Sequence, residues 1–237
     1  GLTSVTIPDS ITEISSRTFS SCTGLTNITI PNSVTKIDEK AFIGCVGLTS
    51  IIISDSVTKI GSRAFSGCTG LTNITLGNRL AEVDEYAFFD CSNLTKAVIN
   101  CTNVPKIGRI YKLKEVVLGA SVTQISDGAF EFCHITKAVI NCNPIPKLGI
   151  GSLKEVVIGN NVTKIGRAAF FGCTNLTSVT IPNNVIEIDK YAFSGCTNTE
   201  VKLPENITEI GLCAFGYGPD TSCKKVLIKS GHNFDRI

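Results

Sequence analysis

The sequence lacks the features that would indicate a nucleic-acid-binding or membrane-spanning protein. Its 22 Lys and Arg residues are nearly balanced by 20 Asp and Glu residues. The net charge of +2 therefore gives no basic footprint for nucleic acid or for an acidic membrane surface. No apolar run approaches the roughly 20 residues of a membrane-spanning helix. The chain also has no methionine and begins with Gly1, so we expect any signal peptide or membrane anchor to lie in segments outside this chain.

Residues suited to catalysis are equally scarce. A hydrolase triad needs a histidine held by a carboxylate beside a nucleophile, and the chain has two histidines. His134 follows Cys133, whose side chain we expect to point into the core, and His232 lies in the C-terminal tail. The glycines follow no phosphate-binding pattern, and zinc sites need closely spaced Cys pairs with further Cys or His. We therefore predict a protein that is not an enzyme, with no cofactor, metal, small-molecule substrate or nucleic-acid partner.

Cysteine, by contrast, is abundant and regularly spaced. Four of the eleven cysteines, from Cys22 to Cys91, are each 23 residues apart, and the same interval separates Cys173 from Cys196. They mark a repeat with the pattern L-x-x-V-x-I-P-x-x-V-x-x-I-x-x-x-A-F-x-x-C. The units begin near Leu2, Leu25, Leu48, Leu71, Leu94, Leu113, Ile135, Leu153, Leu176 and Asn198, with a partial unit from Cys223.

A repeat of 23 residues predicts a stacked architecture. One such unit cannot bury a two-sided core alone, so neighbouring units must cover each other, as in a solenoid. Ile28 and Ile30 alternate with polar residues, which favours a short strand, and copies of it would pair in parallel about 4.8 Å apart. Residues 34–37 favour a second extended stretch. Residues 38–42 favour a single helical turn, with Phe42 filling the interior.

The pattern, and above all its A-F-x-x-C half, resembles the leucine-rich repeat family and specifically its BspA-like class. The resemblance covers residues 2–237 and implies a single solenoid domain over 1–237 of the α/β class. It implies a right-handed horseshoe with a parallel β-sheet on the concave face, and with short strands and helical turns on the convex side. It also implies export or surface display, since many relatives are surface proteins of host-associated bacteria and protists and are often adhesive.

Two units depart from the pattern. Residues 94–112 and 135–152 lack the A-F-x-x-C half, and the segments 94–134 and 135–175 are 41-residue copies of one another. Three prolines oppose a helix in these units: Pro105, Pro144 and Pro146. We expect a thinner, extended convex side there and a change of curvature.

The repeated cysteines allow two interpretations. Ladder positions about 4.8 Å apart lie within the Cα range for disulfides. A small, buried, hydrophobic cysteine repeated in every coil explains them equally, and we favour this interpretation. Cys101 and Cys142 have another coil between them and should not pair, whereas Cys213 and Cys223 are the cysteines most expected to be bonded. Seven N-x-S/T sequons either mark glycosylation or arise from the repeat itself.

The outward strand positions change in character along the chain. They are mostly Thr, Asn and Ser in the N-terminal units, but the third outward position becomes valine in four consecutive units: Val98, Val117, Val139 and Val157. Charged residues occupy the other two positions: Lys96, Glu115, Lys137 and Glu155 at the second, and Lys114 and Lys154 at the first. Either these residues staple the sheet, or an apolar stripe with a charged border binds a partner.

The sequence therefore predicts a non-catalytic binding module, extracellular or displayed on a cell surface. The expected partner is a protein, from a host or its matrix, bound by adhesin-like contacts along the concave face. Two alternatives remain: an architectural spacer for another domain, and the repeat region of a larger enzyme.

Overall fold

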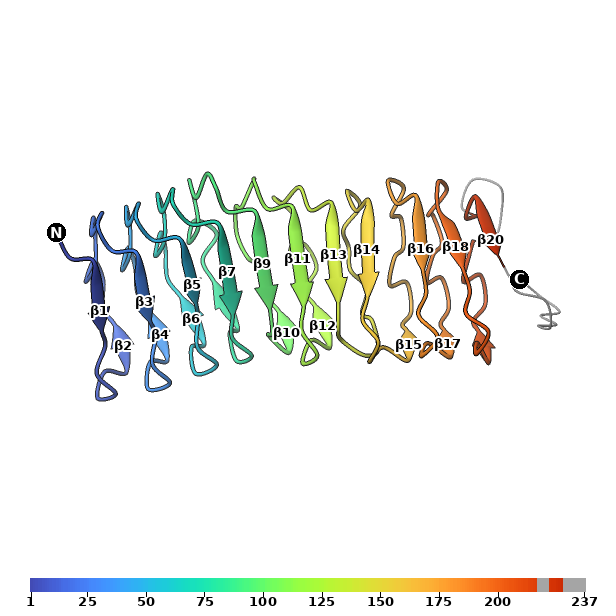
Figure 1. Ribbon diagram of the computed structural model, residues 1–237, viewed down its shortest axis with the longest axis horizontal. Coiled ribbons are helices and arrows are strands. Elements are labelled where there is room, and N and C mark those ends of the chain that lie inside the picture. Colours follow the sequence, from blue (N-terminus) through green and yellow to red (C-terminus); the bar gives the residue numbers. More distant parts are fainter. Residues whose placement is uncertain (217–221, 228–237) are drawn as a thin grey trace. The chain divides into compact units, whose positions relative to one another are not determined.

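The computed structural model describes residues 1–216 and 222–227 (Figure 1). The chain divides into two compact units. The first unit contains residues 1–116 and 126–134, and the second contains residues 117–125 and the chain from 135 onward. The tail that carries His232 lies outside the described residues. In both units the chain winds as a parallel β-solenoid, with about nine turns in all.

The first unit has two faces of short parallel strands. The longer strands are β1 (Ser4–Thr6), β3 (Asn27–Thr29), β5 (Ser50–Ile52), β7 (Asn73–Leu76) and β9 (Lys96–Ile99). The shorter strands are β2 (Glu13–Ile14), β4 (Lys36–Ile37), β6 (Lys59–Ile60), β8 (Glu82–Val83) and β10 (Asn103–Val104). β2, β4, β6 and β8 form one sheet, and each longer strand pairs with its equivalent one coil away, as Val5 does with Ile28. The pairing register therefore follows the sequence repeat.

The second unit repeats this arrangement. Its longer strands are β13 (Lys137–Ile140), β14 (Glu155–Ile158), β16 (Ser178–Thr180), β18 (Glu200–Lys202) and β20 (Lys225–Leu227). Its shorter strands are β12 (Gln124–Ile125), β15 (Lys164–Ile165), β17 (Glu187–Ile188) and β19 (Glu209–Ile210), while β11 (Glu115–Leu118) crosses the boundary between the units in sequence. β15, β17 and β19 pair in parallel, as do β16, β18 and β20.

A column of phenylalanine rings fills the interior, as the repeat predicts. In the first unit the rings of Phe42 and Phe65 stack with their centroids 5.1 Å apart and their planes 3° from parallel. In the second unit the rings of Phe170 and Phe193 stack at 5.0 Å. Burying one such side chain contributes about 1.5–3 kcal/mol. The stack thus runs through the successive regular coils of each unit, from Phe19 to Phe88 and from Phe170 to Phe215.

The expected helical turns are absent, because the described residues form no helix. Residues 38–42 form consecutive β-turns instead. Alternate amides bond in different directions here: Phe42 N–H donates to Ala64 O of the next coil (2.7 Å), whereas Ile43 N–H donates locally to Lys40 O (3.1 Å). Lys40 adopts a positive φ of 56°, which an α-helix does not allow. Hydrogen bonds between coils replace those of a helix, so the α/β class was wrong for this side.

All eleven cysteines are free thiols, so none forms a disulfide. Thiols of the repeated cysteines instead form hydrogen bonds with backbone carbonyls of the preceding coil. The Sγ atom of Cys68 lies 3.1 Å from Phe42 O of the preceding coil, and that of Cys196 lies 3.0 Å from Phe170 O. The expected Cys213–Cys223 bond is not formed. Cys223 takes the ladder position, with its Sγ 3.5 Å from Phe193 O. Cys213 sits in the positive-φ turn position (φ 53°), equivalent to Lys40.

The two short units are extended where the prolines predicted it. Residues 105–110 follow strand β10 without regular structure, and Ile145 forms an isolated parallel bridge with Ile165. The right-handed winding and the changes of curvature stay predictions.

Candidate partner-binding face

The outward valines, here called the valine stripe, lie in both units: Val98 in the first, and Val117, Val139 and Val157 in the second. In the second unit β13 and β14 pair in register, which places Val139 opposite Val157 and Lys137 opposite Glu155. Val157 is 43% exposed, Val139 and Val117 are half-buried, and Lys154 is fully on the surface. In the first unit Val98 is half-buried on β9 opposite Thr75, with Lys96 and Glu115 half-buried and Lys114 exposed. The structure thus brings together an apolar pair with a charged border in the second unit.

Ion pairs form the charged border in both units. Lys137 Nζ lies 2.9 Å from Glu155 Oε1, and Lys96 Nζ lies 2.8 Å from Glu115 Oε1. Both pairs are partly exposed, with side chains 28–57% accessible, and surface pairs of this kind contribute only about 0–1 kcal/mol to stability. The stapling that the sequence suggested is therefore present, but it is weak.

Threonines on the same face have a different use. Thr72 Oγ1 donates to Thr49 O (3.1 Å), and Thr26 Oγ1 lies 3.3 Å from Thr3 O, in each case one coil earlier in the chain. These hydroxyls satisfy carbonyls of the scaffold. Some outward threonines of the N-terminal coils thus already bond the backbone of their own fold, whereas a valine side chain cannot form such a hydrogen bond.

The sequence analysis overlooked Ile52. It lies at the third outward position of the strand face, equivalent to the valines, and its side chain is 67% exposed. β5 pairs in register with β7, which places Ile52 opposite Thr75. The alternation of the repeat marks this position as outward, so the sequence did carry the signal.

No reacting group converges on this face. The described part of the chain contains no group of three or more His, Cys, Asp or Glu residues able to hold a metal ion. Burial raises the pKa of the Cys133 thiol to about 11, whereas a nucleophilic cysteine needs a lowered pKa. The raised pKa thus does not favour Cys133 as a nucleophile beside His134. Within residues 1–216 and 222–227 no helix could cross a membrane.

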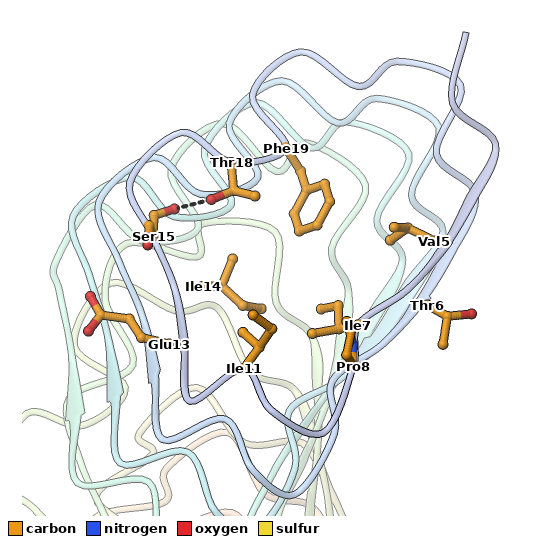
Figure 2. Close-up of a pocket in the computed structure, with 10 residues that line it drawn as sticks. All are labelled: Val5, Thr6, Ile7, Pro8, Ile11, Glu13, Ile14, Ser15, Thr18 and Phe19. Atoms are coloured by element: carbon orange, nitrogen blue, oxygen red, sulfur yellow. Dashed lines mark hydrogen bonds between the residues drawn. The ribbon is translucent and has the colours of Figure 1, made fainter.

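The cleft at the N-terminal end of the first unit is the uncovered end of the core. It encloses about 270 Å³, and Figure 2 shows Ile7, Ile14 and Phe19 pointing into it while Glu13 points away. In the next coil the ring of Phe42 stacks between those of Phe19 and Phe65, whereas Phe19 stacks on one side only in the described residues. Six of the cleft's ten lining residues are apolar, as expected for a cleft formed by the interior of the first coil.

A leucine-rich-repeat solenoid is defined by three features of the structure: the parallel strands, the stacked phenylalanines and the ladder of free, hydrogen-bonded cysteines. The BspA-type leucine-rich repeat region matches the chain in six copies, over residues 1–111, 48–149 and 148–233. The chain belongs to this family. No curated protein matches it.

Solved structures of bacterial leucine-rich repeat proteins are similar to the chain. A leucine-rich repeat protein from Bacteroides ovatus is 24% identical with a TM-score of 0.44, over 91% of this chain and 76% of that one. A leucine-rich cell surface protein from Faecalibacterium prausnitzii is 20% identical with a TM-score of 0.39, over 97% and 80%. The T. pallidum leucine-rich repeat protein is 27% identical with a TM-score of 0.32, over 90% and 75%.

Proposed function

We propose that this chain is a non-catalytic binding module that recognises a protein partner through the strand face of its solenoid. The contact residues in the second unit are Val117, Val139, Val157, Lys137, Lys154 and Glu155, and those in the first unit are Val98, Lys96, Lys114 and Glu115. The partner is a host or matrix protein, and the module acts outside the cell or on its surface.

One observation supports this proposal above the others. Val157 is 43% exposed and lies in register with Val139, beside the Lys137–Glu155 pair. Outward side chains do not pack inside a coil, and Thr occupies the same outward position in neighbouring coils, at Thr75 and Thr180. The fold therefore does not require valine here. An apolar centre with a charged border suits a protein interface, where the border sets orientation and rate of encounter.

The test replaces the apolar pair without altering the strand. Val139→Thr with Val157→Thr keeps the β-branched shape, so the free energy of unfolding should change little, and Lys154→Glu reverses a border charge. We expect the triple variant to remain folded but to lose binding to a panel of purified matrix glycoproteins, measured by biolayer interferometry.

Ile52→Thr is the matched control, because it removes an exposed apolar residue from the same face in the first unit. Undiminished binding by a folded triple variant would contradict the proposed site. Equal loss in the control would show that any apolar residue of the face suffices. A wild-type chain that binds none of the glycoproteins would favour the spacer alternative.

A further inference from the structure

A second surface lies on the turn side of the second unit, the side formed by the A-F-x-x-C segments. A cleft of about 330 Å³ opens there, lined by Lys147, Arg167, Ala168, Phe171 and Tyr191. These residues come from three successive coils, because Leu148 N–H donates to Ala169 O and Ala168 N–H donates to Lys190 O, both at 3.0 Å. The cleft therefore crosses coils and is built by their stacking.

The aromatic part of the cleft is not required by the core. Phe170 fills the interior column and is fully buried, whereas Phe171, the next residue, is 53% exposed. The equivalent residue one coil later is Ser194, which is 1% exposed. Other coils have Ile43 and Glu131 at this position, so the fold does not require a phenylalanine here. Aromatic side chains of this kind are the usual anchors of protein interfaces.

Two cations, Lys147 and Arg167, line the cleft, and Lys190 directly precedes its lining residue Tyr191. Lys147, Arg167 and Lys190 are exposed and occupy successive coils. In the described part of the chain none of them forms an ion pair, and no carboxylate lines the cleft. Other lysines of this unit do form ion pairs with carboxylates, as Lys137 does with Glu155 and Lys164 does with Glu187. Like charges on adjacent coils repel one another, so the scaffold does not benefit from this column.

We propose that this cleft binds an acidic peptide segment of a partner protein. Carboxylates of the segment would face Lys147, Arg167 and Lys190, and an apolar side chain between them would lie against Phe171 and Tyr191. The volume is at the small end for ligand pockets, which suits one large side chain better than a drug-sized ligand.

The reach of an extended peptide agrees with the spacing of the cations. Residues on one face of an extended strand recur about every 6.8 Å, and three stacked coils span about 10 Å. Two or three carboxylates therefore meet the column. The cleft does not involve the valine stripe, so this proposal does not depend on the function proposed for the strand face.

The test uses a defined probe. A nine-residue fluorescein-labelled peptide in which Asp alternates with Phe is titrated with the whole chain and followed by fluorescence anisotropy. We expect saturable binding that weakens as salt rises, and no binding of the same peptide with Asn in place of Asp. Equal binding of the two peptides, or no binding of either, would overturn the proposal.

Variants locate the binding. Lys147→Glu with Arg167→Glu should weaken binding of the acidic peptide at least about tenfold, and Phe171→Ser should weaken it severalfold. The matched control, Arg79→Glu with Lys112→Glu, makes the same change of net charge at exposed cations of the first unit and should leave binding unchanged.

Circular dichroism checks the fold of each variant, and Phe171→Ser keeps the test decisive if the charge reversal fails to fold. A control variant that binds as weakly as the cleft variant would show non-specific attraction and overturn the assignment. Binding of heparin oligosaccharides in place of the peptide would assign the cleft to an acidic polysaccharide and contradict the peptide as its occupant.

Discussion

At the scale of the residue, cysteine is repeated because one small side chain does two things. It fills a slot between coils, and its thiol reaches a phenylalanine carbonyl of the preceding coil, as Cys91 reaches Phe65 at 3.1 Å. Burial raises the pKa of the Cys91 thiol to about 12 and that of Cys142 to about 11. Burial thus disfavours the charged form of these two thiols, which agrees with the interpretation of both cysteines as small buried hydrophobes.

Alkylation of the native protein should separate these thiols. The thiolate is the reactive form, and a raised pKa means that Cys91 and Cys142 hold almost none of it near pH 8. We expect iodoacetamide to modify the half-exposed Cys213 first and to modify Cys91 and Cys142 only after denaturation. Mass mapping of native and denatured samples measures this. Fast labelling of Cys91 in the folded chain would show that its slot is open.

At the scale of the element, the turn side depends on residues that accept a positive φ. The two short units supply a natural comparison, since Gly108 (φ 81°) and Gly149 (φ 65°) occupy equivalent positions in the two 41-residue copies. A Cβ on Gly108 would lie 2.7 Å from Glu85 O, whereas a Cβ on Gly149 would meet nothing within 4 Å. One glycine is therefore needed for conformation and for space, and the other for conformation alone.

Alanine substitution should show the difference. Gly149→Ala should lower the free energy of unfolding by about 1–2 kcal/mol, the cost of a left-handed conformation for an L-residue. Gly108→Ala should cost clearly more, because the new methyl group also displaces the coil that carries Glu85. Urea denaturation of both variants and of the wild type gives the comparison. Equal midpoints for the two variants would mean that the coils can move apart at no cost.

At the scale of the whole molecule, the solenoid is held by hydrogen bonds between coils on every side. The strands pair with the next coil on two faces, and the turns do so on the third through bonds such as Phe42 N–H to Ala64 O. Each coil is thus a complete layer whose stability depends on its neighbours, as in other repeat proteins.

Far-UV circular dichroism of the chain should show a β-type spectrum without the paired minima that helices give. The described residues contain strands and turns but no helix, whereas one helical turn in each regular coil would add a visible helical signal. Helical minima would contradict the turn ladder and restore the α/β class.

Much of the fold was predictable from the sequence, because the repeat carries it many times. The register of the strands and the interior position of Phe42 both follow from the repeat. The turn side was not predictable in the same way. The composition of the short segment from Asp38 to Phe42 suits a helical turn. Its backbone instead donates to a carbonyl of the next coil, as Phe42 N–H does to Ala64 O, and this acceptor is in place only when the coils are stacked.

One of the two candidate surfaces was predictable from the sequence, and the other was visible only in the structure. The sequence by itself determined the family, the spacing of the coils, and the outward position of Val139 and Val157, because side-chain alternation along a strand is a local property. Only the tertiary structure decided that Lys147, Arg167 and Lys190 meet beside Phe171 and that Cys223, not Cys213, joins the ladder. These residues lie far apart in sequence, and what brings them together is the stacking of one coil on the next, which buries the phenylalanine column.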